Sequence, residues 1–275
     1  AQAQDGWPSR PVRVVVPFTP GGSTDILARA LSAELQDTLG QPFVIENRGG
    51  AGGTLGSEVV ARAAPDGHTL MMGHIGTLAV NPSLYRNLTF DTVTSFDPVT
   101  MVAIVPNILA VNPRKVAANN VAELIALARR QPGGLAYGSG GNGSAAHIAM
   151  VAFMQATGPP ALPPVRAGQL RALGVSSLQR LSSAPDIPTI AEQGVAGFDA
   201  TQWYGVVAPA GTPRPIIDRL NAECARILRS DRVRPRLEGE GADPAPGTPE
   251  AFREFIIAER TRWGDLIRRA GVQAD

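Results

Sequence analysis

The sequence has few of the residues that most often carry catalytic or metal chemistry. Its 275 residues include one cysteine, Cys224, and three histidines. A single cysteine excludes an intrachain disulfide, and its apolar helical surroundings predict a buried structural thiol rather than a nucleophile. The histidines His68, His74 and His147 are not spaced as metal ligands. We therefore expect no metal site and no cofactor.

An excess of charge and long apolar runs are also lacking. The formal net charge of +1 gives no reason to expect a nucleic acid or an anionic membrane surface as partner. The longest apolar candidate, Met101 to Val111, is interrupted by Pro106 and Asn107 and falls short of the roughly 18 residues that a membrane-spanning helix needs. The polar, alanine-rich start Ala1-Gln2-Ala3-Gln4 resembles the stub left by signal-peptide removal.

Glycine and short turn residues are abundant, and the segment Val12 to Asp25 is the most informative one. Val14–Val16 predicts a buried strand, and Pro17–Gly22 predicts an irregular turn. Ser23 and Thr24 are candidates for the N-cap of a following helix. A strand, a glycine turn and a helix N-terminus together direct unpaired N–H groups to one point, which predicts an anion-binding loop.

The same order of strand, glycine loop and helix occurs twice more. Leu135–Tyr137 precedes the glycine loop 138–143 and a helix capped by Ser144, and Glu46–Gly53 precedes a helix over Thr54–Ala63. Strands are further expected at 43–46, 69–72, 101–105, 108–111, 170–175 and 203–208, and helices from 120, 213 and 249. This alternation predicts an α/β fold with parallel strands. Loops of this kind in both halves indicate a ligand cleft between two lobes.

The glycine loop 138–143 also fits two enzyme-like interpretations. Gly138, Gly140 and Gly143 match the spacing of a dinucleotide-binding loop, but no acidic residue occurs from Ser144 to Gln179 to hold a ribose. Ser139 does not lie in a nucleophile elbow. A small acyl hydrolase with a cleft serine stays as the rival function.

Several polar candidates have two interpretations. Asp25 either accepts hydrogen bonds from N–H groups that shape the loop Pro20–Thr24 or forms an ion pair with a positive group of a ligand. His74 follows a strand and could line the cleft, whereas His147, in the first turn of a helix, either contacts ligand or packs. His68 adjoins the turn Pro65–Gly67 and is expected to be exposed.

Several longer motifs occur in a fixed order along almost the whole chain. They are PFTPGGSTD at 17–25, VIENRGGAGG at 44–53, NPSLY at 81–85, YGSGGNGSAAH at 137–147, AGQLRAL at 167–173 and APAGTP at 208–213. Taken together, these motifs resemble the periplasmic solute-binding proteins of tripartite tricarboxylate transporters, also called the Bug family.

The resemblance implies a two-lobe periplasmic-binding-protein fold of the type II-like class, each lobe a mixed, mainly parallel sheet flanked by helices. Lobe 1 would comprise residues 7–102 and 208–275, and lobe 2 residues 103–207. It implies no catalysis. A secreted periplasmic monomer would capture a small carboxylate and deliver it to the membrane permease subunits of the transporter. A ligand sensor for a membrane signalling partner would use the same cleft, so that alternative remains open.

The implied ligand contacts are mostly backbone groups of the loops that follow the strands. Carried over residue by residue, they are Phe18, Thr19, Gly21, Gly22, Ser23, Thr24, Asp25, His74, Ile75, Gly76, Thr77, Ser139, Gly140, Asn142, Gly143, Ser144, His147 and Trp203. Backbone donors alone would give marginal affinity, so we expect hinge closure about 102–106 and 203–207. One departure stands out: lobe 2 is shortened near 158–166, where either the deletion is genuine or a segment is absent from this sequence.

Overall fold

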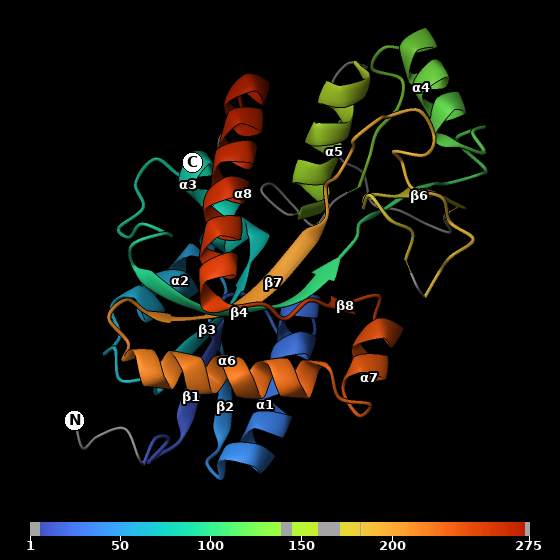
Figure 1. The fold of residues 1–275 in the computed structure, drawn as a ribbon. Coiled ribbons are helices and arrows are strands. Elements are labelled where there is room, and N and C mark those ends of the chain that lie inside the picture. Colours follow the sequence, from blue (N-terminus) through green and yellow to red (C-terminus); the bar gives the residue numbers. More distant parts are fainter. Residues whose placement is uncertain (1–5, 139–144, 159–170, 182, 273–275) are drawn as a thin grey trace. The chain divides into compact units, whose positions relative to one another are not determined.

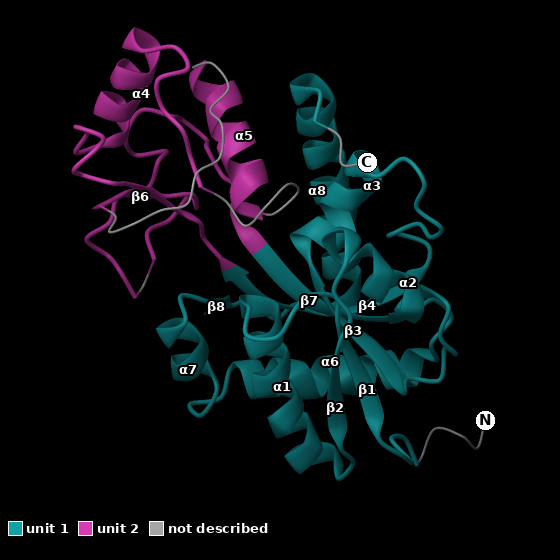
Figure 2. Ribbon diagram, turned by 180° about the vertical axis from the view of Figure 1, so that it is seen from behind, with its two compact units in different colours: residues 1–104, 203–275 teal, residues 105–202 magenta. Residues whose placement is uncertain are grey.

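The computed structural model describes residues 6–138, 145–158, 171–181 and 183–272. These residues form two compact units (Figure 2). Unit 1 comprises residues up to Ile104 and from Trp203 onward, and unit 2 comprises Val105–Gln202. The chain passes between them twice, once at the end of strand β4 (Phe96–Val105) and once at the start of strand β7 (Gln202–Pro209).

Unit 1 is built on a six-stranded sheet with the order β2-β1-β3-β7-β4-β8 (Figure 1). Its remaining strands are β1 (Val12–Val16), β2 (Phe43–Asn47), β3 (Thr69–His74) and β8 (Asp243–Pro244). β1 pairs in parallel with both β2 and β3, whereas β7 runs antiparallel to β3 and β8 antiparallel to β4. The predicted α/β class is therefore confirmed, with a mixed sheet in this unit.

Helices cover this sheet and extend from it. They are α1 (Ser23–Leu39), α2 (Thr54–Ala61), α3 (Asn81–Leu84), α6 (Arg214–Leu228), α7 (Arg234–Gly239) and α8 (Pro249–Ala270), together with a 3-10 turn η1 (Ala51–Gly53) and a π-helical turn η2 (Gly76–Val80). Helix α1 packs on the β2-β1-β3 part of the sheet and on α6, and α8 packs on η2 and α3.

Local sequence explains several of the helix ends. Gly40 and Gly271 adopt the left-handed conformation that ends α1 and α8, with φ of 72° and 64°. Thr248 caps α8 by accepting a hydrogen bond from the Ala251 N–H at 3.1 Å. The expectation that Pro213 is the first residue of α6 was wrong by one position: Pro213 is the N-cap, and the helix begins at Arg214.

Unit 2 has a smaller described sheet. Strands β5 (Ile108–Val111) and β6 (Arg171–Val175) pair antiparallel, and helices α4 (Val121–Arg130) and α5 (Ala145–Thr157) accompany them. Asn120 caps α4 as predicted, accepting the Glu123 N–H at 2.8 Å. The mainly parallel sheet expected of each lobe is not found in this part of unit 2, because its only paired strands within the described ranges are antiparallel neighbours.

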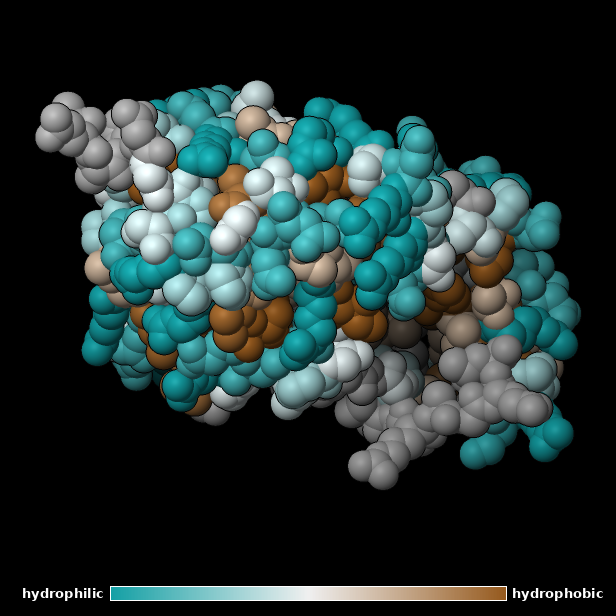
Figure 3. Space-filling view, turned by 90° about the horizontal axis from the view of Figure 1, so that it is seen from below, coloured by the Kyte–Doolittle hydropathy of each residue, from teal (hydrophilic) through white to brown (hydrophobic). Residues whose placement is uncertain are grey.

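The core of unit 1 contains a buried charge between two indoles. Glu259 accepts hydrogen bonds from Nε1 of Trp203 at 2.9 Å and from Nε1 of Trp263 at 2.8 Å, and pairs with Arg262. Two donors and a counter-ion offset the cost of burying the carboxylate. On the face seen in Figure 3, apolar residues lie in small groups among hydrophilic ones. Within the described ranges, no helix combines the length and the apolar character that crossing a bilayer requires.

Candidate functional site

Three loops of unit 1 leave the sheet at the same edge. Pro17–Gly22 follows β1, Arg48–Gly50 follows β2, and Ile75 joins β3 to η2. Because β1 lies between β2 and β3 and runs parallel to both, the carboxyl ends of the three strands lie side by side. Ligands of open α/β sheets bind at this edge, so these loops form the candidate site of unit 1.

Glycines let the three loops pack backbone against backbone. A Cβ on Gly56 would lie 2.6 Å from the carbonyl oxygen of Arg48 and 2.9 Å from Cα of Pro17. A Cβ on Gly53 would lie 2.6 Å from Cγ2 of Thr77. Real Cβ atoms do not approach other atoms this closely, so the loops hold one another in position only while these residues are glycine.

A carboxylate holds the first loop to the first helix. Asp25, which is buried, accepts hydrogen bonds from the Gly21 N–H at 3.0 Å, from Arg29 Nε at 2.9 Å and from Asn47 Nδ2 at 2.9 Å. Asn47 Nδ2 also donates to the carbonyl of Phe18 at 3.2 Å. The hydrogen bond from Arg29, aided by those from Gly21 and Asn47, lowers the pKa of Asp25 to about 2.

This network supports one of the two interpretations of Asp25. The carboxylate accepts the Gly21 N–H and so shapes the loop, as in the first interpretation. Its charge is paired with Arg29, whose side chain is half exposed. The pair has no net charge, so the Asp25 carboxylate repels an anion at the start of α1 much less than an isolated charge would.

The start of α1 offers three unpaired N–H groups. Gly22 is the N-cap, and its carbonyl accepts the N–H groups of Asp25 and Ile26 at 2.9 and 3.0 Å. No acceptor for the N–H groups of Gly22, Ser23 or Thr24 occurs within the described part of the chain. The expectation that Ser23 or Thr24 caps the helix was wrong, since α1 already begins at Ser23 and no side chain caps it.

A polar and aromatic cluster around His74 packs against the loop that follows β1. His74 is 7% exposed, and its Nδ1 accepts the Gly76 N–H at 3.0 Å. Thr77 Oγ1 donates to the His74 carbonyl and accepts the His74 N–H, each at 3.0 Å. Because Nδ1 acts as an acceptor, the neutral His74 carries its ring proton on Nε2.

Two aromatic rings pack on His74. The ring of Phe18 lies 5.3 Å away edge-on, and that of Tyr204 lies 5.0 Å away, on the residue directly opposite His74 in the β3–β7 pairing. The Tyr204 side chain hydrogen-bonds to Ser23, and burial raises the pKa of Tyr204 to about 12. This hydroxyl therefore stays neutral and ties strand β7 to the first residue of α1.

The structure thus brings most of the predicted unit 1 residues together. Phe18, Thr19 and Gly21 to Asp25 lie in one loop and helix start, and His74 to Thr77 lie next to them, with Ile75 only 3% exposed. Trp203 is 1% exposed and its indole N–H is taken by Glu259, so it presents no surface to a ligand here.

The predicted unit 2 residues are described less fully. Ser139, Gly140, Asn142, Gly143 and Ser144 lie outside the described residues. His147 is half buried in the first turn of α5, and burial lowers its pKa.

The burial of His68 was not expected, whereas that of Cys224 was. The expectation of an exposed His68 was wrong: it is 9% exposed and packs edge-on against Trp7 at 6.2 Å. The turn Pro65–Gly67 is only partly exposed, with Gly67 buried, and the imidazole of His68 is buried with it. Cys224 is fully buried, as predicted, and burial raises its pKa to about 12.

Sequence reasoning missed three contributors to this site. Arg29 and Asn47 complete the Asp25 network, and Tyr204 contacts both His74 and Ser23. The spacing of Asp25 and Arg29, four residues apart in a predicted helix, could have indicated their ion pair. Within the described ranges, no cluster of three or more histidine, cysteine or acidic side chains could hold a metal ion.

Comparison with known proteins identifies the family of this chain. The chain matches the sequence profile of the tripartite tricarboxylate transporter family receptor over residues 27–159 and 150–272. It is 36% identical to Protein BugT of Bordetella pertussis, over 98% of this chain and 92% of BugT.

Two solved structures extend the comparison. The fold is similar to that of R. palustris Rpa4515 with adipate, with a TM-score of 0.89 and 35% identity over 97% of this chain and 99% of the other. It is also similar to MatC from Rhodopseudomonas palustris with bound malate, with a TM-score of 0.83 and 32% identity over 95% and 100% of the two chains.

The alignments also expose a length difference. The alignment with BugT spans 300 positions but takes in only 98% of these 275 residues, so about 30 positions have no counterpart in this chain. The family profile matches in two segments that overlap at residues 150–159. A break at that point lies at the end of α5, immediately before the stretch 158–166.

Proposed function

Because the chain belongs to the tripartite tricarboxylate transporter receptor family, we propose that it captures a small carboxylate and delivers it to the membrane subunits of such a transporter. Members of this family are periplasmic binding proteins, so the proposed location is the periplasm, after removal of a signal peptide. The proposed role involves no turnover of the ligand, and the proposed working form is a monomer.

One observation carries the proposal. Three N–H groups, those of Gly22, Ser23 and Thr24, are unpaired at the N-terminus of a 17-residue helix. The helix dipole adds partial positive charge at the same place, so a carboxylate is favoured there. The Asp25 network, the glycine contacts and the Tyr204–Ser23 hydrogen bond hold these donors in place before a ligand arrives, which reduces the entropic cost of binding.

The ligand class follows from chemistry and from the similar proteins. The structures of Rpa4515 and MatC contain adipate and malate, which are both dicarboxylates. One carboxylate would accept the N–H groups at the start of α1. We propose a dicarboxylate of up to about this size as the ligand of the present chain.

Magnitudes indicate that these donors do not act alone. A hydrogen bond to a charged group contributes about 1.5–3 kcal/mol, so three give about 5–9 kcal/mol. Micromolar affinity requires about 8 kcal/mol after association costs of about 4–15 kcal/mol. Three backbone donors therefore leave a shortfall in binding free energy. We predict that an interlobe cleft and hinge closure supply the rest. Small-angle scattering should show a smaller radius of gyration with saturating ligand, and an unchanged radius with tight binding would contradict closure.

A pair of substitutions at one position tests the donors. Ser23 is the first residue of α1, where proline is well tolerated, and Gly22 before it has the extended φ of −83° and ψ of 168° that proline favours. Ser23→Pro therefore removes one N–H donor and leaves the helix start in place. Ser23→Ala removes only the hydroxyl and serves as the matched control.

Isothermal titration with adipate and with malate measures the effect. We expect the wild-type chain to bind at least one of the two, Ser23→Ala to bind within a few-fold of it, and Ser23→Pro to bind roughly 10- to 100-fold more weakly. Equal affinities of the proline and alanine variants would show that the Ser23 amide does not hold the ligand. Failure of the wild-type protein to bind any small dicarboxylate would overturn the proposal.

A further inference from the structure

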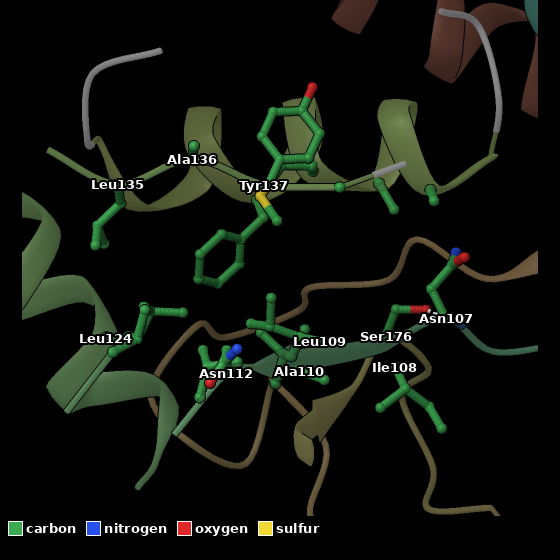
Figure 4. A pocket seen from close by; sticks show the side chains of 18 of the residues that line it. Asn107, Ile108, Leu109, Ala110, Asn112, Leu124, Leu135, Ala136, Tyr137 and Ser176 are labelled. Atoms are coloured by element: carbon green, nitrogen blue, oxygen red, sulfur yellow. Dashed lines mark hydrogen bonds between the residues drawn. The ribbon is translucent and has the colours of Figure 1, made fainter. Parts of the chain in front are cut away.

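Unit 2 contains a cavity of its own. Its volume is about 280 Å³, and it lies between strand β5, the segment Leu135–Tyr137 and helix α5 (Figure 4). Figure 4 shows Leu135 and Ala136 on one side of the space, with Leu109 and Ala110 of β5 on the other. Every residue that lines it belongs to unit 2, so the cavity depends on the packing of this unit alone.

The cavity wall reaches the place where the family profile breaks. The two profile segments overlap at residues 150–159, and Met150 and Phe153 of α5 in that stretch line the cavity. In the described part of the sheet β5 pairs with β6 on one side only. The alignment with BugT contains about 30 positions without a counterpart in this chain. Within the described residues, the cavity lies beside β5.

The cavity wall is apolar along most of its length. Leu124 of α4, Phe153 of α5 and Phe198 are buried side chains that face it, and Ile108 is 50% exposed at β5. A cavity of about 150 Å³ lined by such side chains stays dry and binds benzene. The volume in unit 2 is nearly twice as large, so it suits an apolar body of one ring with a short chain.

The polar residues of the wall differ in whether they already have hydrogen-bond or ion-pair partners. Asn107 donates its backbone N–H to Ser176 Oγ and its side-chain Nδ2 to the carbonyl of Ala200, and its Oδ1 accepts from Gln202, so both its amide groups already have partners within the protein. Among the described residues of the wall, Lys115 is the one charged residue, its side chain is exposed, and no described carboxylate pairs with it. The described part of the wall includes no acidic residue. An anionic group is thus favoured at Lys115.

We propose that this cavity binds a second ligand: a monocarboxylate with an aromatic or aliphatic body, which lies along β5 with its carboxylate at Lys115. The site differs chemically from the one in unit 1. There, backbone amides and a helix dipole suit a short polar dicarboxylate, whereas here an apolar wall and a single ammonium suit a longer apolar acid. A second carboxylate on such a ligand would have to be buried against Leu and Phe side chains without a partner, which is costly.

A charged probe and its neutral counterpart test the role of Lys115. The probes are 4-phenylbutyrate and 4-phenylbutanol, which share one apolar body. In isothermal titrations we expect wild-type protein to bind 4-phenylbutyrate about tenfold more tightly than the alcohol. Lys115→Met keeps the length of the side chain and removes the charge, and it should bring the two affinities within about twofold of each other. An undiminished preference for the acid in Lys115→Met would overturn the assignment of its anchor.

Filling the cavity tests the place of binding. Ala149 lies on α5 in the cavity wall, and Ala156 lies on the exposed side of the same helix. Ala149→Phe should abolish binding of both probes, whereas Ala156→Phe should bind them as wild type does. Circular dichroism and the urea midpoint of each variant show whether it is folded. A folded Ala149→Phe that still binds 4-phenylbutyrate would rule out this cavity.

The Ser23→Pro variant separates this site from the proposed site in unit 1. We expect Ser23→Pro to bind 4-phenylbutyrate as wild type does while its binding of adipate and malate falls. A parallel loss of both ligand classes would mean that the probe occupies the unit 1 site, and the second site would be withdrawn. If no dicarboxylate binds at all but the two alanine-to-phenylalanine variants differ as expected, the cavity stands without the transport role.

Discussion

Strands β1 and β5 begin from similar sequences and end in different surroundings. Both are short β-branched or aliphatic runs followed by turns. β1 lies between two parallel neighbours, and the loops after these strands touch through glycines and through the Asp25 network. β5 has one described neighbour and a cavity beside it. The strength of a strand pattern therefore says little about how firmly the surrounding residues are packed.

The largest expected contrast is between one substitution in each unit. Phe252 is 2% exposed and packs edge-on against Trp203, whereas Phe153 borders the cavity and contacts Phe198. We expect Phe252→Ala to lower the free energy of unfolding by about 3–5 kcal/mol. Phe153→Ala should cost only about 1–2 kcal/mol because its side chain has already lost contacts on one side. Urea denaturation of both variants provides the numbers, and equal costs would contradict looser packing in unit 2.

Crowding the loops of unit 1 gives the next largest effect. Gly56→Ala places a Cβ against backbone atoms of Arg48 and Pro17, which no rotamer change can relieve. We expect a loss of about 1–3 kcal/mol in the free energy of unfolding, together with weaker dicarboxylate binding. Gly239→Ala is the control, because a Cβ there meets no atom within 4 Å and the residue lies in helix α7. A variant Gly56→Ala as stable as Gly239→Ala would disprove the close approach.

Acid should weaken the unit 1 network by a smaller amount. The pKa of Asp25 in the folded chain is about 2, below its usual 3.8, so its contribution is complete above about pH 4 and disappears as the pH falls toward 2. Linkage gives about 1–2 kcal/mol after allowance for the exposed Arg29. Asp25→Asn should flatten that part of the stability profile, measured by urea denaturation between pH 2 and pH 5. A profile that Asp25→Asn leaves unaltered would contradict the role of this carboxylate.

Removing a helix cap should cost the same stability in both units, in contrast to the substitutions that probe packing. Thr248 caps α8 in unit 1, and Asn120 caps α4 in unit 2, each through one side-chain oxygen. Thr248→Ala and Asn120→Ala should each cost about 1 kcal/mol, because a cap acts on its own first turn and not on the packing around it. Thermal unfolding of the two variants measures this. A cost in unit 2 far below that in unit 1 would mean that α4 unfolds separately from the rest.

Features that depend on neighbours in the sequence were predictable. The strand Val12–Val16, the helix that follows it, the cap at Asn120 and the burial of Cys224 all follow from patterns within a few residues. So do the unpaired N–H groups at the start of α1, since such groups accompany every helix start. The family resemblance carried the prediction of a solute-binding receptor, which the profile match confirms.

Features that depend on distant residues were decided only by the tertiary structure. Tyr204 meets His74 because β7 pairs with β3, and Asn47 reaches Asp25 because β2 lies beside β1. His68 is buried because Trp7 packs on it, although its turn reads as exposed. The cavity in unit 2 forms where β5, the segment Leu135–Tyr137 and α5 meet, which no local pattern of the sequence indicates. Sequence fixes local backbone choices through short-range sterics and hydrogen bonding, whereas burial and unfilled space depend on which strands and helices meet.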